Sequence, residues 1–451
     1  MLNRKFLTAF FLIAFLGAFS FYLFHIYKVK HMNTKQFEIE WGVSLSSGTF
    51  TNYKDNTNAI AVESRVVKSP VDTNMQTSFH LADGTWLRTV DGPSGWWGLG
   101  STPLGGNLFK QPLPEMLHLT FFDSYDNQFY QLIQPLPKEK IYDLMTTVHK
   151  GTADDTDNPS PNVYDTFDIG FAPKGWIILY AIGAGTRKEI RSWQATKIDA
   201  DYIQHVGLNY TGNLEYLKTN DIRKKHVQSA LDDFKKRNPA IYKRWMDGTL
   251  KVNSDWYKML QTKFPWNLEV NAPDADWSGE YYAEYANVER YEILDDQLEA
   301  DKTHLKAAPV KIGTWLTYKP TGVRYYVEIH MFPIPKWSAD GYIPYYQDPN
   351  LALYFKNFQE LFPLSSLARN ETPAHEAEFG KIVLDFDEDF KIKEAYLKRG
   401  KTIRSLDGAY EYYLAPQDLR RGKYIAEQGH PHFLTAPKIP DLTDPVFADR
   451  D

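Results

Sequence analysis

The sequence predicts an α+β protein, built mostly of antiparallel β-sheet modules with helices packed on one side, plus one N-terminal transmembrane helix. Three observations predict it. Many short segments alternate apolar and polar residues, which is typical of half-buried strands. A few longer segments repeat apolar residues every three to four positions, as amphipathic helices do. The chain begins with an uncharged run, from Phe6 to Phe24, that is long enough to cross a membrane.

The composition is that of a globular protein with a substantial core. The chain has 451 residues, of which 43% are hydrophobic, and aromatic residues make up 15%, which suits the faces of β-sheets. The net charge is -6 and no basic stripe stands out, so we expect no nucleic-acid partner. The absence of cysteine excludes disulfides, thiolate metal sites and cysteine nucleophiles.

The N-terminus predicts a membrane anchor. Residues 1–5 form a short basic tail that is expected in the cytoplasm, and residues 6–27 form a transmembrane signal anchor. The run from Phe6 to Phe24, at about 1.5 Å per residue, approaches the thickness of the hydrocarbon layer. A signal peptide that is cleaved after Ser20 is the alternative. In both cases the rest of the chain is expected outside the cytoplasm.

Residues 32–275 are predicted to form a first β-rich module. Its first strand carries apolar residues at every second position, namely Phe37, Ile39, Trp41, Val43 and Leu45. Further on, the segment from Leu117 to Pro137 is a hairpin with its turn at Asn127. Pro137 then begins a helix. The apolar face of that helix consists of Ile141, Leu144, Met145 and Val148.

A glycine-rich loop from Asp91 to Asn107 carries the candidate binding residues Trp96 and Trp97. The loop lacks the Gly-Lys-Ser/Thr ending of a phosphate-binding loop. Pro103 stands where a dinucleotide fingerprint needs its third glycine. One interpretation is an ordered loop that packs both tryptophans onto a sheet. The alternative is a contact with a partner, because paired tryptophans on a loop are good interface anchors.

The stretch from Tyr164 to Ala195 is predicted to be the centre of this module. An alternating strand leads to a turn in which Gly175 can take a positive φ. A continuous apolar run from Trp176 to Tyr180 follows, as expected for a central strand covered on both faces. A more polar element, which contains Ile190 and Trp193, completes the stretch.

The remaining chain is divided by its changing periodicity. Residues 221–264 switch to a period of 3.6, which predicts a helical segment on one face or edge of the sheet. Residues 276–310 mix acidic and aromatic residues and are predicted to be a linker. Residues 311–451 are predicted to form a second β-rich module. It contains a hairpin that turns at Gly322, a helix, and a last hairpin; the apolar face of the helix consists of Leu351, Tyr354, Phe355 and Phe358.

The central stretch also carries a resemblance to a known family. The pattern Gly170-Phe171-Ala172-Pro173-x-Gly175, the apolar strand after it, Arg187 to Ile190 and Trp193 to Ala195 resemble domain-of-unknown-function family 2931. This family is bacterial and envelope-associated, without an assigned activity. The resemblance is strongest from Tyr164 to Ala195. Together with the N-terminal apolar run, it implies a single-pass inner-membrane protein with the bulk of its chain in the periplasm. Some relatives occur beside secreted antibacterial effectors, which implies an immunity role. Many members have a lipid-anchoring cysteine, which this chain lacks.

The sequence offers few groups for chemistry. Asp385, Asp387 and Asp389 alternate like the start of a calcium loop, but Phe390 stands where that loop needs glycine, so we expect a solvated turn. His430-Pro431-His432 has no third metal ligand at helical spacing. Glu328 and His330 share one strand face and could serve acid–base work, although a polar sheet face explains them equally well. No serine-hydrolase elbow or zinc-protease motif occurs. We therefore expect no catalytic residue, metal or cofactor.

These patterns together predict a non-enzymatic binding protein that faces the cell envelope. The membrane is one expected partner, through the N-terminal helix, and the other is a protein, a toxin or effector that an immunity protein would neutralise. Two alternatives stay open. One is a membrane-tethered hydrolase whose catalytic residues are dispersed in the sequence. The other is a glycan-binding or structural envelope protein with a flat row of exposed aromatic side chains.

Overall fold

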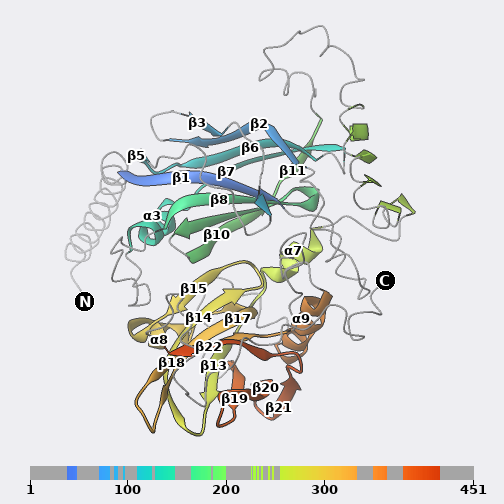
Figure 1. Ribbon diagram of the computed structural model, residues 1–451. Helices are drawn as coiled ribbons and strands as arrows, with labels where there is room; N and C mark the ends of the chain where they lie inside the picture. Colours follow the sequence, from blue (N-terminus) through green and yellow to red (C-terminus); the bar gives the residue numbers. More distant parts are fainter. Residues whose placement is uncertain are drawn as a thin grey trace, which may run out of the picture.

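The computed structural model describes residues 38–47, 71–81, 86–89, 95–96, 109–123, 127–147, 164–183, 186–199, 254–332, 349–362 and 379–416, with single residues between 225 and 247. We call residues 38–199 the first half and residues 254–416 the second half. Figure 1 shows the first half, in blue to green, above the second half, in yellow to red, with α7 (Asp255–Leu260) between them. The described part is mostly strand with few helices, which confirms the predicted β-rich fold.

One long sheet runs through both halves. Its described strands follow the order β22, β18, β17, β14, β15, β10, β9, β8, β1 and β4, and β5 also pairs with β1. Neighbours are antiparallel except where β1 pairs with β4 and with β8. The halves join where Arg187 of β10 pairs with Arg290 of β15. The strands are β1 (Glu38–Ser47), β4 (Gly95–Trp96), β5 (Phe109–Pro112), β8 (Tyr164–Ala172), β9 (Trp176–Gly183), β10 (Thr186–Gln194), β14 (Ala275–Tyr285), β15 (Arg290–Ile293), β17 (Pro309–Tyr318), β18 (Arg324–His330) and β22 (Tyr410–Pro416).

Each half adds a smaller sheet to the long one. In the first half the order is β11, β7, β6, β2 and β3, and in the second half it is β13, β19, β20 and β21. The first set is β11 (Thr196–Ile198), β7 (Gln128–Pro135), β6 (Met116–Asp123), β2 (Val71–His80) and β3 (Trp86–Thr89). The second set is β13 (Trp266–Asn271), β19 (Gly380–Phe386), β20 (Ile392–Arg399) and β21 (Thr402–Ser405). A short ladder joins β12 (Lys263–Phe264) to β16 (Lys306–Ala307).

The first core lies between the long sheet and the smaller sheet of the first half. Trp41, Phe79 and Phe167 come from three different strands and form one aromatic cluster, with ring centroids 5.2 to 5.5 Å apart. The helix α3 (Lys138–Thr146) adds Ile141 and Met145 to this core. Large rings in edge and stacked contact bury much apolar area, which holds the two sheets together.

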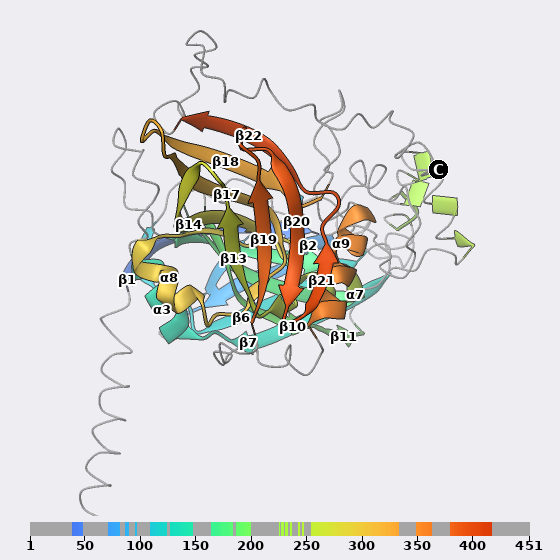
Figure 2. The same ribbon diagram turned by 90° about the horizontal axis from the view of Figure 1, so that it is seen from below.

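The second core lies between the long sheet and the smaller sheet of the second half. Phe390, in the turn after β19, packs against Tyr318 and Tyr325 of the long sheet with ring centroids 5.9 and 5.6 Å apart. The helix α9 (Pro349–Leu361) presents Phe358 to Phe264, at 5.2 Å. Figure 2 shows β13, β19, β20 and β21 side by side, with α9 next to β21. The predicted apolar face of this helix is therefore confirmed.

The strand β9 is covered on both faces, as its continuous apolar run predicts. Ile177 and Leu179 belong to the first core, whereas Ile178 and Tyr180 belong to the second. All four side chains have no solvent exposure. Because successive side chains of a strand point to opposite faces, β9 is the place where one strand contributes to both cores.

The predicted turns and helices are also confirmed where the structure describes them. Asn127, Gly175 and Gly322 take positive φ values of 48°, 77° and 68° in the turns after β6, β8 and β17. Pro137 directly precedes α3. In the predicted helical segment, α7 is a helix, and the described residues between 225 and 246 are helical.

Two parts of the chain differ from the prediction. The polar element after Gly183 is a third strand of the central stretch, because it pairs with β9 as β10. Residues 276–310, predicted to be a linker, hold most of β14, all of β15, the short helix α8 (Leu298–Asp301) and β16. Their mixed composition arises because the side chains of a strand point alternately to its two faces. Tyr281 and Tyr285 lie in the second core, while Tyr282 and Glu284 point away from it. The division into two modules stays a prediction.

Several predicted features lie outside the described residues. They are the tail 1–5, the anchor 6–27, Trp97, and His430 and His432. Among the helices that the structure describes, none is both long enough and apolar enough to span a membrane.

Candidate functional site

The backbone of Trp96 lies at the end of the long sheet. Trp96 is the last residue of β4, and it pairs in parallel with Ser47 of β1. Residues 91–94 and 97–107 of the glycine-rich loop, Trp97 among them, lie outside the described residues. The structure therefore places Gly95 and Trp96 of this loop at the end of the strand order. Its contact with a partner stays a prediction.

The pair Glu328 and His330 belongs to a larger charged cluster on the face of β14, β17 and β18 that points away from the second core. The Lys311 ammonium lies 2.8 Å from the Glu284 carboxylate and 3.5 Å from that of Glu328. Nε2 of His330 lies 3.5 Å from Glu328, and its Nδ1 lies 3.3 Å from the Tyr410 hydroxyl. We call Lys311, Glu284, Glu328 and His330 the outer-face cluster.

Neighbouring groups favour the ionised forms of Glu328 and Lys311. Burial would raise the pKa of Glu328, but the hydrogen bond with His330 and the Lys311 ammonium outweigh burial and leave that pKa lowered. Burial would lower the pKa of Lys311, but Glu284 and Glu328 outweigh it and leave that pKa raised. A carboxylate with a lowered pKa is a weak proton acceptor. The cluster therefore suits a fixed charge pattern better than acid–base chemistry.

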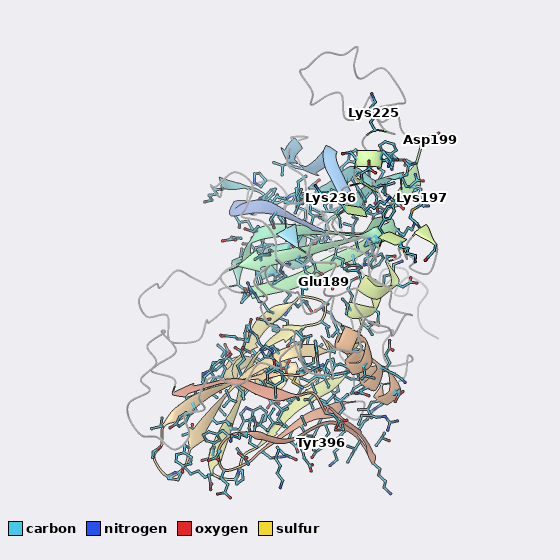
Figure 3. The ribbon with its side chains drawn as sticks, turned by 45° about the vertical axis from the view of Figure 1, so that its right-hand side comes forward. Glu189, Lys197, Asp199, Lys225, Lys236 and Tyr396 are labelled. Atoms are coloured by element: carbon cyan, nitrogen blue, oxygen red, sulfur yellow. The ribbon has the colours of Figure 1, made fainter. Side chains whose placement is uncertain are left out.

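A second charged cluster lies where the two halves meet, between β10 and the turn from β14 to β15. Figure 3 labels Glu189 at the lower edge of the first half, next to the second half. The Glu189 backbone N–H donates to Oε1 of Glu289 at 2.9 Å. Nδ2 of Asn287 donates to Oε2 of Glu289 at 2.8 Å and reaches Oε2 of Glu189 at 3.5 Å. The Lys263 ammonium lies 3.2 Å from Glu289. We call Glu189, Lys263, Asn287 and Glu289 the seam cluster.

The turn that carries Asn287 and Glu289 has an unusual backbone. Val288 between them has a φ of 62°, a region that β-branched residues rarely adopt. The turn is closed by the Tyr285 N–H, which donates to the Glu289 carbonyl at 2.8 Å. The Asn287 side chain accepts the Glu289 N–H at 3.2 Å. Backbone strain of this kind persists only where surrounding contacts hold it, and it gathers at functional sites.

The two carboxyl groups of the seam cluster have pKa values that are displaced in opposite directions. Burial raises the pKa of Glu189; Lys263 opposes this effect, and the Glu289 carboxylate adds to it. Burial alone would also raise the pKa of Glu289. Lys263, Lys188 and Asn287 outweigh burial there, so the pKa of Glu289 is lowered. Such a pair can hold one proton between two carboxyl groups. Enzymes that use one carboxyl group as acid and another as base show the same separation.

A buried ion pair lies beside the seam cluster. Nη1 of Arg187 is 3.0 Å from Asp168, whose other oxygen accepts the Ser44 hydroxyl at 2.8 Å. The Arg187 guanidinium also lies 5.4 Å from the Tyr180 ring centroid, and the Tyr180 hydroxyl donates to the Asn287 carbonyl at 3.0 Å. The pair therefore ties β1, β8 and β10 together and supports the seam cluster from the side of the first half.

A second buried ion pair fixes α8 in the other half. The Lys306 ammonium lies 2.7 Å from Asp301, and the Tyr281 hydroxyl donates to the same carboxylate at 2.7 Å. Lys306 also lies over the Trp266 ring, 4.8 Å from its centroid. Burial lowers the pKa of Lys306, and the Asp301 carboxylate opposes this effect only in part. Because its partners are complete and buried, this group stabilises the packing of α8.

The acidic turn after β19 is held by its own backbone. Oδ1 of Asp387 accepts the backbone N–H groups of Asp389 and Lys391, each at 2.9 Å. Asp385 accepts the Asn271 side-chain amide at 2.7 Å. Among the described residues, no three histidine, aspartate or glutamate side chains are grouped so that they could hold a metal ion.

Sequence reasoning missed the seam cluster. Its one local signal is Arg187-Lys188-Glu189, three charges in a strand that continues an apolar hairpin. These three residues also belong to the family pattern. Glu189 meets its partner Glu289 across 100 residues of chain, so spacing along the sequence gives no indication of the pair.

Comparisons of the chain with models of protein families, with curated proteins and with solved structures gave no match. The resemblance to family 2931 therefore stays a prediction. The function has to be argued from the residues themselves.

Proposed function

We propose that the protein is a membrane-anchored, envelope-facing binding protein that neutralises an antibacterial effector by covering it, as an immunity protein does. The observation that carries this proposal is the pairing of charged groups on the outer face of the long sheet. The Lys311 ammonium lies 2.8 Å from the Glu284 carboxylate and 3.5 Å from that of Glu328. Charges held in this way give a sheet framework a fixed pattern, which suits recognition by shape and charge.

The uncharged N-terminal run and the family resemblance support the location of this function. The run predicts attachment to the inner membrane, with the described body in the periplasm. Contact with the effector begins, in this proposal, at Trp96 and Trp97. Trp96 ends a strand of the long sheet, so the loop starts from a rigid base. Tryptophan is also enriched among the residues that dominate binding energy at interfaces.

Protection of living cells tests the proposal. Cells that produce the full-length chain are challenged with each effector encoded beside it, and survival is counted. The test variant combines Trp96→Ala with Trp97→Ala. The matched control is Leu353→Ala, because Leu353 is an apolar residue with 64% exposure on α9. We expect the wild type and the control to protect and the double variant to lose protection. Failure of the wild type against every neighbouring effector would contradict the proposal.

The seam cluster favours a second candidate, a membrane-tethered hydrolase. A protonated Glu189 could donate a proton to a leaving group while the ionised Glu289 carboxylate stabilises positive charge that develops on the substrate. Glu289 is only 1% exposed, so a substrate would require the seam to open. This candidate predicts that Glu189→Gln abolishes turnover. The glycan-binding alternative has less support, because every tryptophan and tyrosine side chain that the structure describes is buried or half-buried.

A further inference from the structure

Polar contacts join the two halves along β9 and β10. They include a backbone-to-carboxylate bond, a hydroxyl-to-carbonyl bond and two bonds to glutamine side chains. The pairs are Glu189 with Glu289 at 2.9 Å, Tyr180 with Asn287 at 3.0 Å, Trp176 with Gln261 at 2.7 Å and Lys258 with Gln194 at 3.1 Å. Closure of the halves therefore depends in part on the turn that carries Asn287 and Glu289.

Two carboxyl groups from opposite halves approach the same amide in this contact. Nδ2 of Asn287 lies 2.8 Å from Oε2 of Glu289 and 3.5 Å from Oε2 of Glu189. The Glu289 carboxylate repels an ionised Glu189, and one proton on the pair removes that repulsion. The strained Val288, at φ 62°, shows that the turn is held in place by contacts such as these.

Several groups from both halves act on the Glu189 carboxyl group. Lys263 of β12 attracts it and the Gln261 side chain hydrogen-bonds to it, which both favour the ionised form, while the Glu289 carboxylate repels it. Lys140 of α3 also acts on it, from its bond to the Ile190 carbonyl at 2.6 Å. Further neighbours in the same electrostatic network are Asp168, Arg187, Lys188 and Asp301. Arg187 and Asp301 are already engaged, with Asp168 and Lys306 respectively.

From this arrangement we propose that the seam cluster is a proton-controlled latch between the two halves. It closes most tightly when Glu189 carries a proton, and it loosens when Glu189 ionises. The latch depends only on contacts within the fold. The proposal therefore applies equally to a protein that covers an effector and to one that turns over a substrate.

The displaced pKa values give the direction of the pH dependence. Burial raises the pKa of Glu189 in the folded state. Its contribution to closure is therefore complete below the unfolded pKa of about 4.3 and is lost as the pH rises through the folded pKa. The pKa of Glu289 is lowered, because Lys263, Lys188 and Asn287 outweigh its burial. The contribution of Glu289 to closure is therefore present above its unfolded pKa and is lost as the pH falls through its folded pKa. Closure is thus tightest near the ordinary carboxyl pKa and weaker on both sides.

Hydrogen exchange of the full-length chain measures the latch. The Glu189 amide, which is bound to Glu289, reports opening of the seam, and the Leu397 amide in β20 reports the distant sheet. Exchange rates are corrected for the intrinsic effect of pH. We expect the protection of Glu189 to fall as the pH rises above about 4.3, by at most about tenfold per pH unit, because one proton is lost. Protection at Leu397 stays constant. Constant protection at Glu189 would overturn the proposal.

Three variants separate the latch from a general loss of stability. Glu189→Gln removes the titrating group, so its seam protection should stay flat above pH 4.3. Glu394→Gln, an exposed residue on β20, should keep the wild-type profile. If Glu189→Gln does not fold, Glu289→Gln serves instead, because loss of the repelling carboxylate should make the fall with pH smaller. An unchanged pH profile in Glu189→Gln, or in Glu289→Gln where that variant replaces it, would contradict the latch.

Discussion

The backbone N–H of Glu189 donates a hydrogen bond to the Glu289 carboxylate, at 2.9 Å and across 100 residues of chain. A strand of the first half is thereby held by a side chain of the second half. The two cores also meet at β9, whose alternate side chains enter one core and then the other. The halves share both a sheet and a charged seam, so we expect a destabilising substitution in one half to lower the stability of the other half as well.

Loss of the buried cation at Arg187 should strongly destabilise the protein. Arg187→Met leaves Asp168, which has no solvent exposure, without the guanidinium that lies 3.0 Å from it. Removal of one partner from a buried pair costs about 3–5 kcal/mol. The matched control is Lys302→Met, because Lys302 and Glu299 are 52% and 86% exposed and such pairs contribute about 0–1 kcal/mol. Urea denaturation of both variants measures the difference, and equal stabilities would refute a structural role for the pair.

The glycine at position 175 should tolerate no side chain. A Cβ there would lie 2.4 Å from the buried Tyr130 ring, and φ is 77°, so Gly175→Ala meets both a clash and backbone strain. Gly400→Ala is the matched control, because φ is 57° but nothing lies within 4 Å of its Cβ. We expect Gly175→Ala to cost about 1–3 kcal/mol more than the control, which is the usual cost of overpacking. Thermal unfolding measures it, and equal shifts in the two variants would contradict the account.

Acid should remove the stabilisation that Glu328 provides. Although burial raises its pKa, His330 and Lys311 outweigh burial and leave that pKa below the ordinary value. The ionised Glu328 therefore stabilises the fold above about pH 4.3, and this contribution is lost as the pH falls through the folded pKa. Glu328→Gln should be less stable than the wild type at pH 7, and the difference should shrink toward pH 2. A difference that stays constant with pH would show that Glu328 acts by packing alone.

The sequence predicted the strands and helices in which the order of apolar and polar residues follows a single pattern from end to end. β1 alternates cleanly, β9 is apolar throughout, and α9 repeats with the helical period, so each was assigned correctly. Residues 276–310 were misassigned because β14 carries its charged residues and Tyr282 on one face and the buried Tyr281 and Tyr285 on the other. The seam cluster was missed for a different reason. Its members are common charged residues whose meaning comes from contacts between strands distant in sequence, and no local pattern encodes those.

Charges placed inside the N-terminal run should release the protein from the membrane. Phe11→Arg together with Phe15→Arg puts two cations where the run is expected to cross the hydrocarbon layer, each at a cost of about 2.5–3.5 kcal/mol. Asn33→Arg, beyond the run, is the control and should not change membrane retention. Membrane fractions washed at alkaline pH are assayed for the full-length chain. Equal retention of both variants would argue against the anchor.

The stoichiometry of effector inhibition tests the central claim most directly. The purified full-length chain is titrated against a fixed amount of the effector that it is proposed to neutralise, and effector activity is followed with time. A protein that acts by covering its partner should abolish activity at a fixed molar ratio, with no further loss on longer incubation. Progressive inactivation by a small fraction of an equivalent would contradict this account, because it would require the chain to turn over.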